Sequence, residues 1–178
     1  MKKRFQQILT AVFCAVFLIS GIEVFAQQDR SKRPSPPDTV SQKIQNVNIE
    51  IAYSRPSVKG RQIWGTLVPY DKVWRTGANE ATTFKTDKDI KIEGKVLPAG
   101  RYALFTIPGE KEWTIIFNKN ADQMGAYNYD SNLDVLRVKV KPSASNDFTE
   151  LFTIRAEETG NVSILWEKMK VDFKVSAK

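Results

Sequence analysis

The residues of this chain best suited to bind a ligand are gathered in one segment, which runs from Ser54 to Phe84 and reads SRPSVKGRQIWGTLVPYDKVWRTGANEATTF. It places flat aromatic rings close to guanidinium groups, a combination that suits sugars, carboxylates or phosphates. Such groups on loops at one end of a rigid β-scaffold are a common form of binding site. The sequence therefore predicts a site for a small polar, anionic or carbohydrate-like ligand. The candidate ligand-binding residues are Arg55, Arg61, Trp64, Tyr70, Trp74, Arg75, Asn79 and Glu80.

The same segment also has a structural interpretation. Trp64 and Trp74 would cap one end of a β-sandwich, because a tryptophan buries a large apolar area and anchors a loop. Arg75 and Glu80 would then form an internal ion pair that ties the loop down. Large aromatic side chains belong to a core more often than to a ligand platform. The exposure of these side chains distinguishes a binding site from a structural anchor.

Two further functions stay open at the level of sequence. The first is a hydrolase that uses carboxylates, with Glu80 as acid or base and Asp71 or Asp130 as its partner. Glycoside hydrolysis needs two carboxylates about 5–10 Å apart in a cleft. The second is a structural protein of the cell envelope with no small-molecule site. The sequence favours a non-enzymatic binding module, and no catalytic residue is assigned.

Residues that are missing exclude whole classes of chemistry. The chain contains no histidine, so it has neither a Ser-His-Asp triad nor a histidine zinc site. Its single cysteine, Cys14, lies in the N-terminal apolar run, which leaves the rest of the chain without disulfides or thiolate ligands. No nucleophile elbow, phosphate-binding glycine loop or dinucleotide fingerprint is present. The sequence therefore points to no cofactor and no metal site.

The N-terminal residues have the three parts of a secretory signal. Cations at residues 2–4 precede an apolar run over residues 8–22, and Val24 and Ala26 occupy the −3 and −1 positions of a small-residue cleavage site. The apolar run is short for a membrane span of about 20 residues. We expect cleavage near Ala26 and export to the periplasm or beyond, with no stable membrane insertion afterwards. Residues 1–26 are thus predicted to be a signal peptide.

The remaining length is that of one domain. Residues 27–43 are polar and proline-rich and are predicted to form a flexible leader, of which residues 33–42 can pack on a sheet as an edge segment. Residues 44–178 are predicted to form a single β-sandwich domain. The net charge of +7 favours solubility and calls for no nucleic-acid partner. The pattern leaves the oligomeric state undetermined.

Alternation of apolar and polar residues predicts several strands. It is clearest at residues 47–54, and it returns at residues 136–141 and 169–176. Two other runs, at residues 101–107 and 113–118, are apolar on both faces, which is typical of central strands. The PGEKE between these two runs is predicted to be a hairpin connection.

These patterns together predict an all-β fold. Eight to ten short strands separated by turns indicate an antiparallel β-sandwich, with a jelly roll as one arrangement. At most one or two short helices are expected, within residues 121–125 or near residues 70–75.

Three sequence motifs indicate a resemblance to a known family. The segment YSRPSVKGRQIWGTLVPYDKVWRTGANEATTF is followed by LPAGRYALFTIPGEKEWTIIFNKN and then by QMGAYNYD. Over roughly residues 34–175, the chain resembles the bacterial family catalogued as domain of unknown function 2911. The resemblance implies an exported protein with a β-rich domain and implies no activity, cofactor or catalytic residue. The family's motif coincides here with Arg55, Pro56, Gly60, Trp64, Gly65, Pro69, Tyr70, Trp74, Arg75, Gly77, Asn79 and Glu80.

Overall fold

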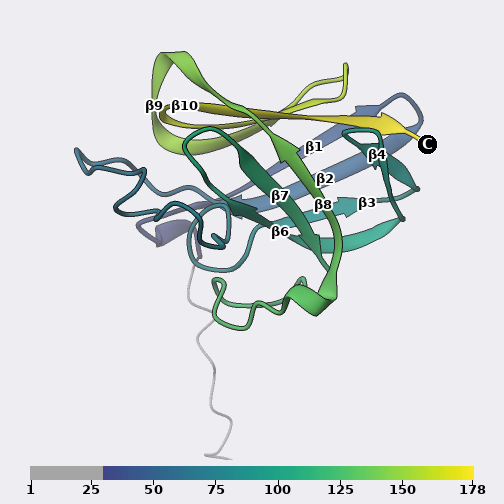
Figure 1. Cartoon of the computed structure of the whole chain (residues 1–178), viewed down its shortest axis with the longest axis horizontal. Coiled ribbons are helices and arrows are strands. Elements are labelled where there is room, and N and C mark those ends of the chain that lie inside the picture. Colours follow the sequence, from purple (N-terminus) through teal and green to yellow (C-terminus); the bar gives the residue numbers. More distant parts are fainter. Residues whose placement is uncertain (1–29) are drawn as a thin grey trace, which may run out of the picture.

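Two antiparallel β-sheets pack face to face in the computed structural model, which describes residues 30–178 (Figure 1). The six-stranded sheet has the order β1-β2-β3-β6-β7-β8, and the four-stranded sheet has the order β5-β4-β10-β9. The predicted all-β sandwich is confirmed. The strands are β1 (Pro37–Ile44), β2 (Val47–Ser54), β3 (Thr83–Thr86), β4 (Ile90–Ile92), β5 (Lys95–Leu97), β6 (Gly100–Ile107), β7 (Trp113–Asn118), β8 (Asp134–Val140), β9 (Pro142–Ala156) and β10 (Asn161–Ala177).

Two short 3-10 helices are the helical elements of residues 30–178: η1 (Arg30–Lys32) and η2 (Ser131–Leu133). Their number agrees with the prediction, but neither lies at residues 121–125 or 70–75. Residues 121–125 form an irregular segment instead, which pairs with the segment before β3. Ala81 donates its N–H to the carbonyl of Gln123 at 3.0 Å, and an isolated β-bridge joins Glu80 to Met124.

The core lies between the two sheets, and alternation along the strands determines which side chains reach it. In β2, Val47, Ile49 and Ile51 are buried, whereas the intervening Asn48 and Glu50 are exposed. This confirms the face predicted for residues 47–54. The strands β6 and β7 are apolar on both faces because their outer face is covered as well. A small second cluster forms there around Phe105 and Ile116, beneath the loops that precede β3 and β8.

β10 reverses direction part-way along its length, as Figure 1 shows. The backbone N–H of Val175 donates to the carbonyl of Gly160 at 2.7 Å, and Ser163 donates to the carboxylate of Asp172. A straight strand rises about 3.3 Å per residue and would hold these pairs far apart. The reversal lies near Glu167, whose φ of 56° is left-handed. Residues 161–166 and the residues after Glu167 therefore lie side by side.

The N-terminal edge of the six-stranded sheet is longer than the sequence indicated. Residues 37–43, which the sequence analysis placed in a flexible leader, belong to β1 and pair with β2 along its whole length. The six-stranded sheet therefore begins at Pro37. A proline at the start of an edge strand is tolerated because no neighbouring strand needs its missing N–H. The edge packing considered for residues 33–42 is present from Pro37 onward.

The predicted signal peptide, residues 1–26, lies outside the described residues. Among residues 30–178, no helix is long and apolar enough to cross a membrane.

Candidate functional site

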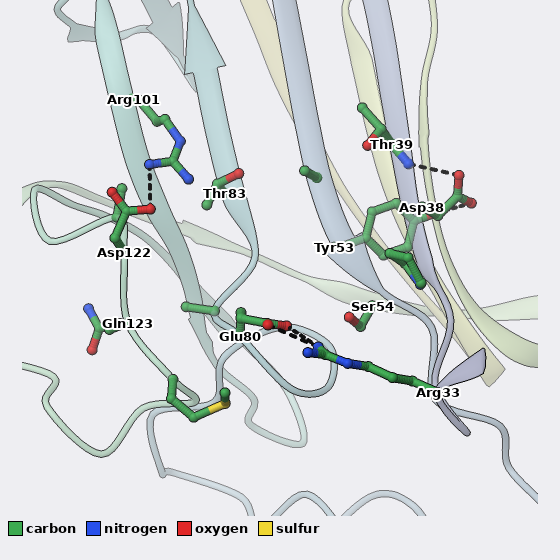
Figure 2. Close-up of a pocket in the computed structure, with 15 residues that line it drawn as sticks. Arg33, Asp38, Thr39, Tyr53, Ser54, Glu80, Thr83, Arg101, Asp122 and Gln123 are labelled. Carbon is green, nitrogen blue, oxygen red and sulfur yellow. Dashed lines mark hydrogen bonds and ion pairs between the residues drawn. The ribbon is translucent and has the colours of Figure 1, made fainter. Parts of the chain in front are cut away.

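A pocket of about 500 Å³ opens on the outer face of the six-stranded sheet (Figure 2). Its floor is a row of small side chains on adjacent strands, because Thr39 of β1 pairs with Ala52 of β2, which pairs with Thr83 of β3. Residues two apart on a strand share a face. The next row on this face carries longer side chains, among them Lys85 and Arg101. The hollow therefore comes from a change in side-chain size between two neighbouring rows.

Two ion pairs form opposite borders of the pocket. Nη1 of Arg33 lies 2.9 Å from both carboxylate oxygens of Glu80. Nη1 of Arg101 lies 2.7 Å from Oδ1 of Asp122. Figure 2 shows these two pairs apart from one another, with open space between them. The first pair is the more enclosed, with side-chain exposures of 22% for Arg33 and 35% for Glu80.

The charges at the borders of the pocket are mixed, with two arginines against two carboxylates. Asp38 also belongs to the lining, but its side chain lies on the face of β1 opposite to that of Thr39, where its carboxylate pairs with Arg55 at 3.3 Å. The bonds that Arg33 and Arg101 make to their carboxylates use Nη1 only, which leaves Nε and Nη2 of each as further donors of residues that line the pocket. Donors and acceptors thus stand close together, which suits ligand hydroxyl groups that both donate and accept. This lining does not favour a polyanion.

Tyr53 lies beneath the pocket and joins the two sheets. Its hydroxyl donates to Oδ2 of Asp38 at 3.2 Å and accepts the N–H of Ile154 in β9 at 3.0 Å. Burial raises the pKa of Tyr53 to about 12, so the phenol stays protonated at neutral pH. The side chain is 5% exposed and offers no stacking face. Its hydroxyl holds the Asp38 side chain in place at the edge of the sheet.

The loop between β7 and β8 carries Asp122 and is held by a separate network. Tyr129 donates to Oδ2 of Asp134 at 2.6 Å, and Arg137 donates to the hydroxyl of Tyr129 at 2.6 Å. Burial and the hydrogen bond to Asp134 raise the pKa of Tyr129 to about 12. Asn118 adds a bond to the other oxygen of Asp134 at 2.7 Å. This network fixes the end of the loop that forms one wall of the pocket.

Of the eight ligand-binding residues predicted from sequence, only Glu80 lines this pocket. Arg55 is occupied elsewhere, donating to the carbonyl of Phe152 at 3.0 Å and to Thr153 at 2.9 Å. Arg61 donates to the backbone carbonyls of Val58 and Ser57. These two arginines anchor the chain after β2 in the free protein.

Trp64 and Trp74 pack into a cluster of aromatic rings at one end of the core. Trp64 meets Trp113 with ring centroids 5.1 Å apart, and Trp74 stacks on Trp166 at 5.9 Å with an interplanar angle of 10°. Phe152 closes the cluster, 5.4 Å from Trp74. Both predicted tryptophans are half-buried. Their arrangement agrees with the structural interpretation of the segment.

Tyr70 and Asn79 also make contacts within the fold. The ring of Tyr70 lies against Gly65, where an added Cβ would be 3.1 Å from Cε2 of the tyrosine. Asn79 donates to the carbonyl of Ser35 at 3.1 Å and thereby holds the chain before β1.

The ion pair considered between Arg75 and Glu80 does not form. Glu80 pairs with Arg33 instead, and Arg75 makes no salt bridge to any carboxylate of residues 30–178. The fold brings Arg33 alongside the loop before β3, although the two are far apart in the sequence. The carboxylates considered as partners of Glu80 do not line its pocket either, since Asp130 caps η2 and Asp71 lies on an exposed turn.

Residues 35–175 match the model of a family described as "Protein of unknown function (DUF2911)". The chain belongs to the DUF2911 family. The resemblance seen in the sequence motifs is thereby confirmed. Searches of the curated proteins and of the solved structures return no match to this chain.

Sequence reasoning missed most of the pocket of this DUF2911 protein. One available signal was the small size of Ala52 and Thr83 at outward positions in the middle of alternating strands. No local signal marks Arg33, Arg101 or Asp122, because each reaches the pocket only through the tertiary fold. Among residues 30–178, no group of three or more histidine, cysteine, aspartate or glutamate side chains is arranged to hold a metal ion.

Proposed function

We propose that this DUF2911 protein is an exported, non-enzymatic binding protein whose ligand is a small, hydroxyl-rich, carbohydrate-like molecule. The observation that carries the proposal is the pocket on the outer face of the six-stranded sheet, with its floor of small residues and its two bordering ion pairs. Its volume of about 500 Å³ lies within the range of small-molecule sites. Its lining offers fixed donors and acceptors together, which match vicinal hydroxyl groups better than a multiply charged anion.

The state of the carboxylates favours binding over hydrolysis. Each carboxylate that lines the pocket is engaged by an arginine: Glu80 by Arg33, Asp122 by Arg101, and Asp38 by Arg55. A hydrolase needs one carboxylate to transfer a proton and another to attack or activate water. Pairing of all three with guanidinium groups supports a role in holding a ligand in place.

Thr83→Trp is expected to abolish ligand binding, because the indole would fill the pocket from its floor. Lys85→Trp is the matched control, since it adds the same side chain two residues along β3, outside the pocket lining. A panel of mono- and disaccharides, with amino acids and organic anions as comparison sets, is titrated and followed by ligand-observed NMR. We expect at least one saccharide to bind the native protein and Lys85→Trp equally, and to bind Thr83→Trp at least tenfold more weakly. Unchanged affinity in Thr83→Trp, or binding by the anions alone, would contradict the proposal.

Export is tested separately on the full chain expressed in a bacterium. The protein recovered outside the cytoplasm is expected to begin at Gln27, because Ala26 ends the cleavage site. Intact-mass spectrometry measures this directly. A product that retains residues 1–26 would disprove cleavage.

A further inference from the structure

Arg75 has a guanidinium group that the fold positions without giving it a partner. Its backbone is anchored: the carbonyl of Arg75 accepts the N–H of Thr82 at 3.1 Å, and the neighbouring Trp74 exchanges two backbone hydrogen bonds with Thr106. Nε of Arg75 is buried and has no hydrogen-bond acceptor among residues 30–178. A buried donor left unpaired costs free energy. The side chain of Arg75 is therefore held in the protein although its Nε–H forms no hydrogen bond within the described residues.

Other arginines of the described chain differ from Arg75 in this respect. Five of them donate to carboxylates or to backbone carbonyls, and these are Arg33, Arg55, Arg61, Arg101 and Arg137. Arg75 has neither kind of partner in residues 30–178. Its two terminal nitrogens are not among the buried unpaired atoms, so they are open to a molecule from solvent.

An exposed aromatic ring lies next to this guanidinium. At Gly125, an added Cβ would lie 3.1 Å from Cε2 of Tyr127 and 3.6 Å from Nη1 of Arg75. The ring and the cation therefore flank the same backbone position. The side chain of Tyr127 is 83% exposed, so its face is available. Because Gly125 has no side chain, nothing at this position separates the two groups.

We propose that Arg75 and Tyr127 form a binding site for an oxyanion attached to a flat ring, such as an aromatic phosphate or carboxylate. The guanidinium fork would bind two oxygens of the anion, and the tyrosine would stack on the ring. Neither residue lines the pocket at Glu80. The site is thus separate from the proposed saccharide pocket, and it does not depend on that proposal.

The test uses phenyl phosphate, benzoate and inorganic phosphate as probes at constant ionic strength. Binding is followed by ¹H–¹⁵N NMR of the mature protein, including the Nε–Hε signal of Arg75. We expect phenyl phosphate to shift this signal together with the amides around Gly125. Comparison of phenyl phosphate with benzoate shows which oxyanion the fork prefers. A phenyl phosphate titration that leaves the Arg75 signal in place would overturn the site.

Three variants separate a specific site from general attraction to a basic protein. Arg75→Gln is expected to weaken phenyl phosphate binding at least tenfold. Arg155→Gln, which removes the same charge from an exposed position on β9, should leave it unchanged. Tyr127→Ala should weaken phenyl phosphate severalfold but leave inorganic phosphate unaffected. Equal losses in the two arginine variants would overturn the proposal.

If Arg75→Gln fails to fold, Tyr127→Ala still tests the proposed site. The tyrosine is almost fully exposed, so its removal leaves the core intact. Phenyl phosphate binding that does not respond to this variant would show that the ring plays no part and would overturn the proposed site.

Discussion

Trp74→Ala is expected to lower the free energy of unfolding by about 3–5 kcal/mol, the usual cost of deleting a packed aromatic side chain. Trp74 lies in the middle of the aromatic cluster, where it stacks on Trp166 and meets Trp64, Trp113 and Phe152 edge to face. Truncation to alanine would leave a cavity bordered by all four rings. For a chain of this length, the melting temperature should fall by about 6–20 °C. Urea denaturation and thermal melting followed by circular dichroism measure both quantities.

The neighbouring Arg75→Ala provides the contrast. It loses no salt bridge to residues 30–178 and removes a buried donor that has no acceptor there, so we expect a stability change of about 0.5 kcal/mol or less. A large loss of stability in Trp74→Ala and a small one in Arg75→Ala would indicate that Trp74 anchors the segment and that Arg75 is available to contact a ligand. A loss below about 1 kcal/mol for Trp74→Ala would contradict the packing described for the cluster.

Gly160→Ala is expected to destabilise the domain by more than about 4 kcal/mol, a loss seen only where a substitution breaks a specific feature. A Cβ at this position would overlap the backbone carbonyl oxygen of Val175, well inside van der Waals contact. The same two residues form the hydrogen bond that holds the two halves of β10 together. Because the obstacle is backbone, it cannot move aside without opening the reversal. Denaturant unfolding measures the loss.

Gly94→Ala is the matched control for this prediction. Gly94 also has a left-handed φ, at 79° against 86° for Gly160, but an added Cβ would meet no atom within 4 Å. Its substitution should cost only the left-handed strain, about 1–2 kcal/mol. Equal losses at the two glycines would show that backbone strain alone is responsible and that the contact with Val175 contributes nothing.

The strands that sequence reasoning identified are those whose signal is local. In β2, the alternation of Val47, Ile49 and Ile51 with polar residues reports directly which face is buried, because side chains of a strand point to opposite sides in turn. The apolar character of β6 and β7 on both faces likewise indicated that each face is covered. The loops before β3 and β8 cover the outer face, and neither apolar run predicts which segments do so.

The start of β1 was harder to predict from the sequence, for a physical reason. Residues 37–43 form an edge strand whose side chains alternate only between exposed and half-buried, and its one proline, Pro37, follows Pro34 and Pro36 and so resembles part of a linker. Pairing with β2 is what orders it. The alternating run at residues 169–176 contained no sign of the reversal in β10, because the reversal places residues 161–166 beside that run through contacts between residues distant in sequence.

Sequence alone determined that this protein is an all-β domain of the DUF2911 family, that it lacks histidine and that its single cysteine lies in the N-terminal apolar run, because composition, alternation and motif spacing are properties of the chain itself. Only the tertiary structure decided which charged groups meet. Arg33 and Glu80 are 47 residues apart and become neighbours because β1 pairs beside β2 and the loop before β3 turns toward them. The same pairing lines up Thr39, Ala52 and Thr83 to form a floor. A partner across strands depends on strand order and register, which residues nearby in sequence do not specify.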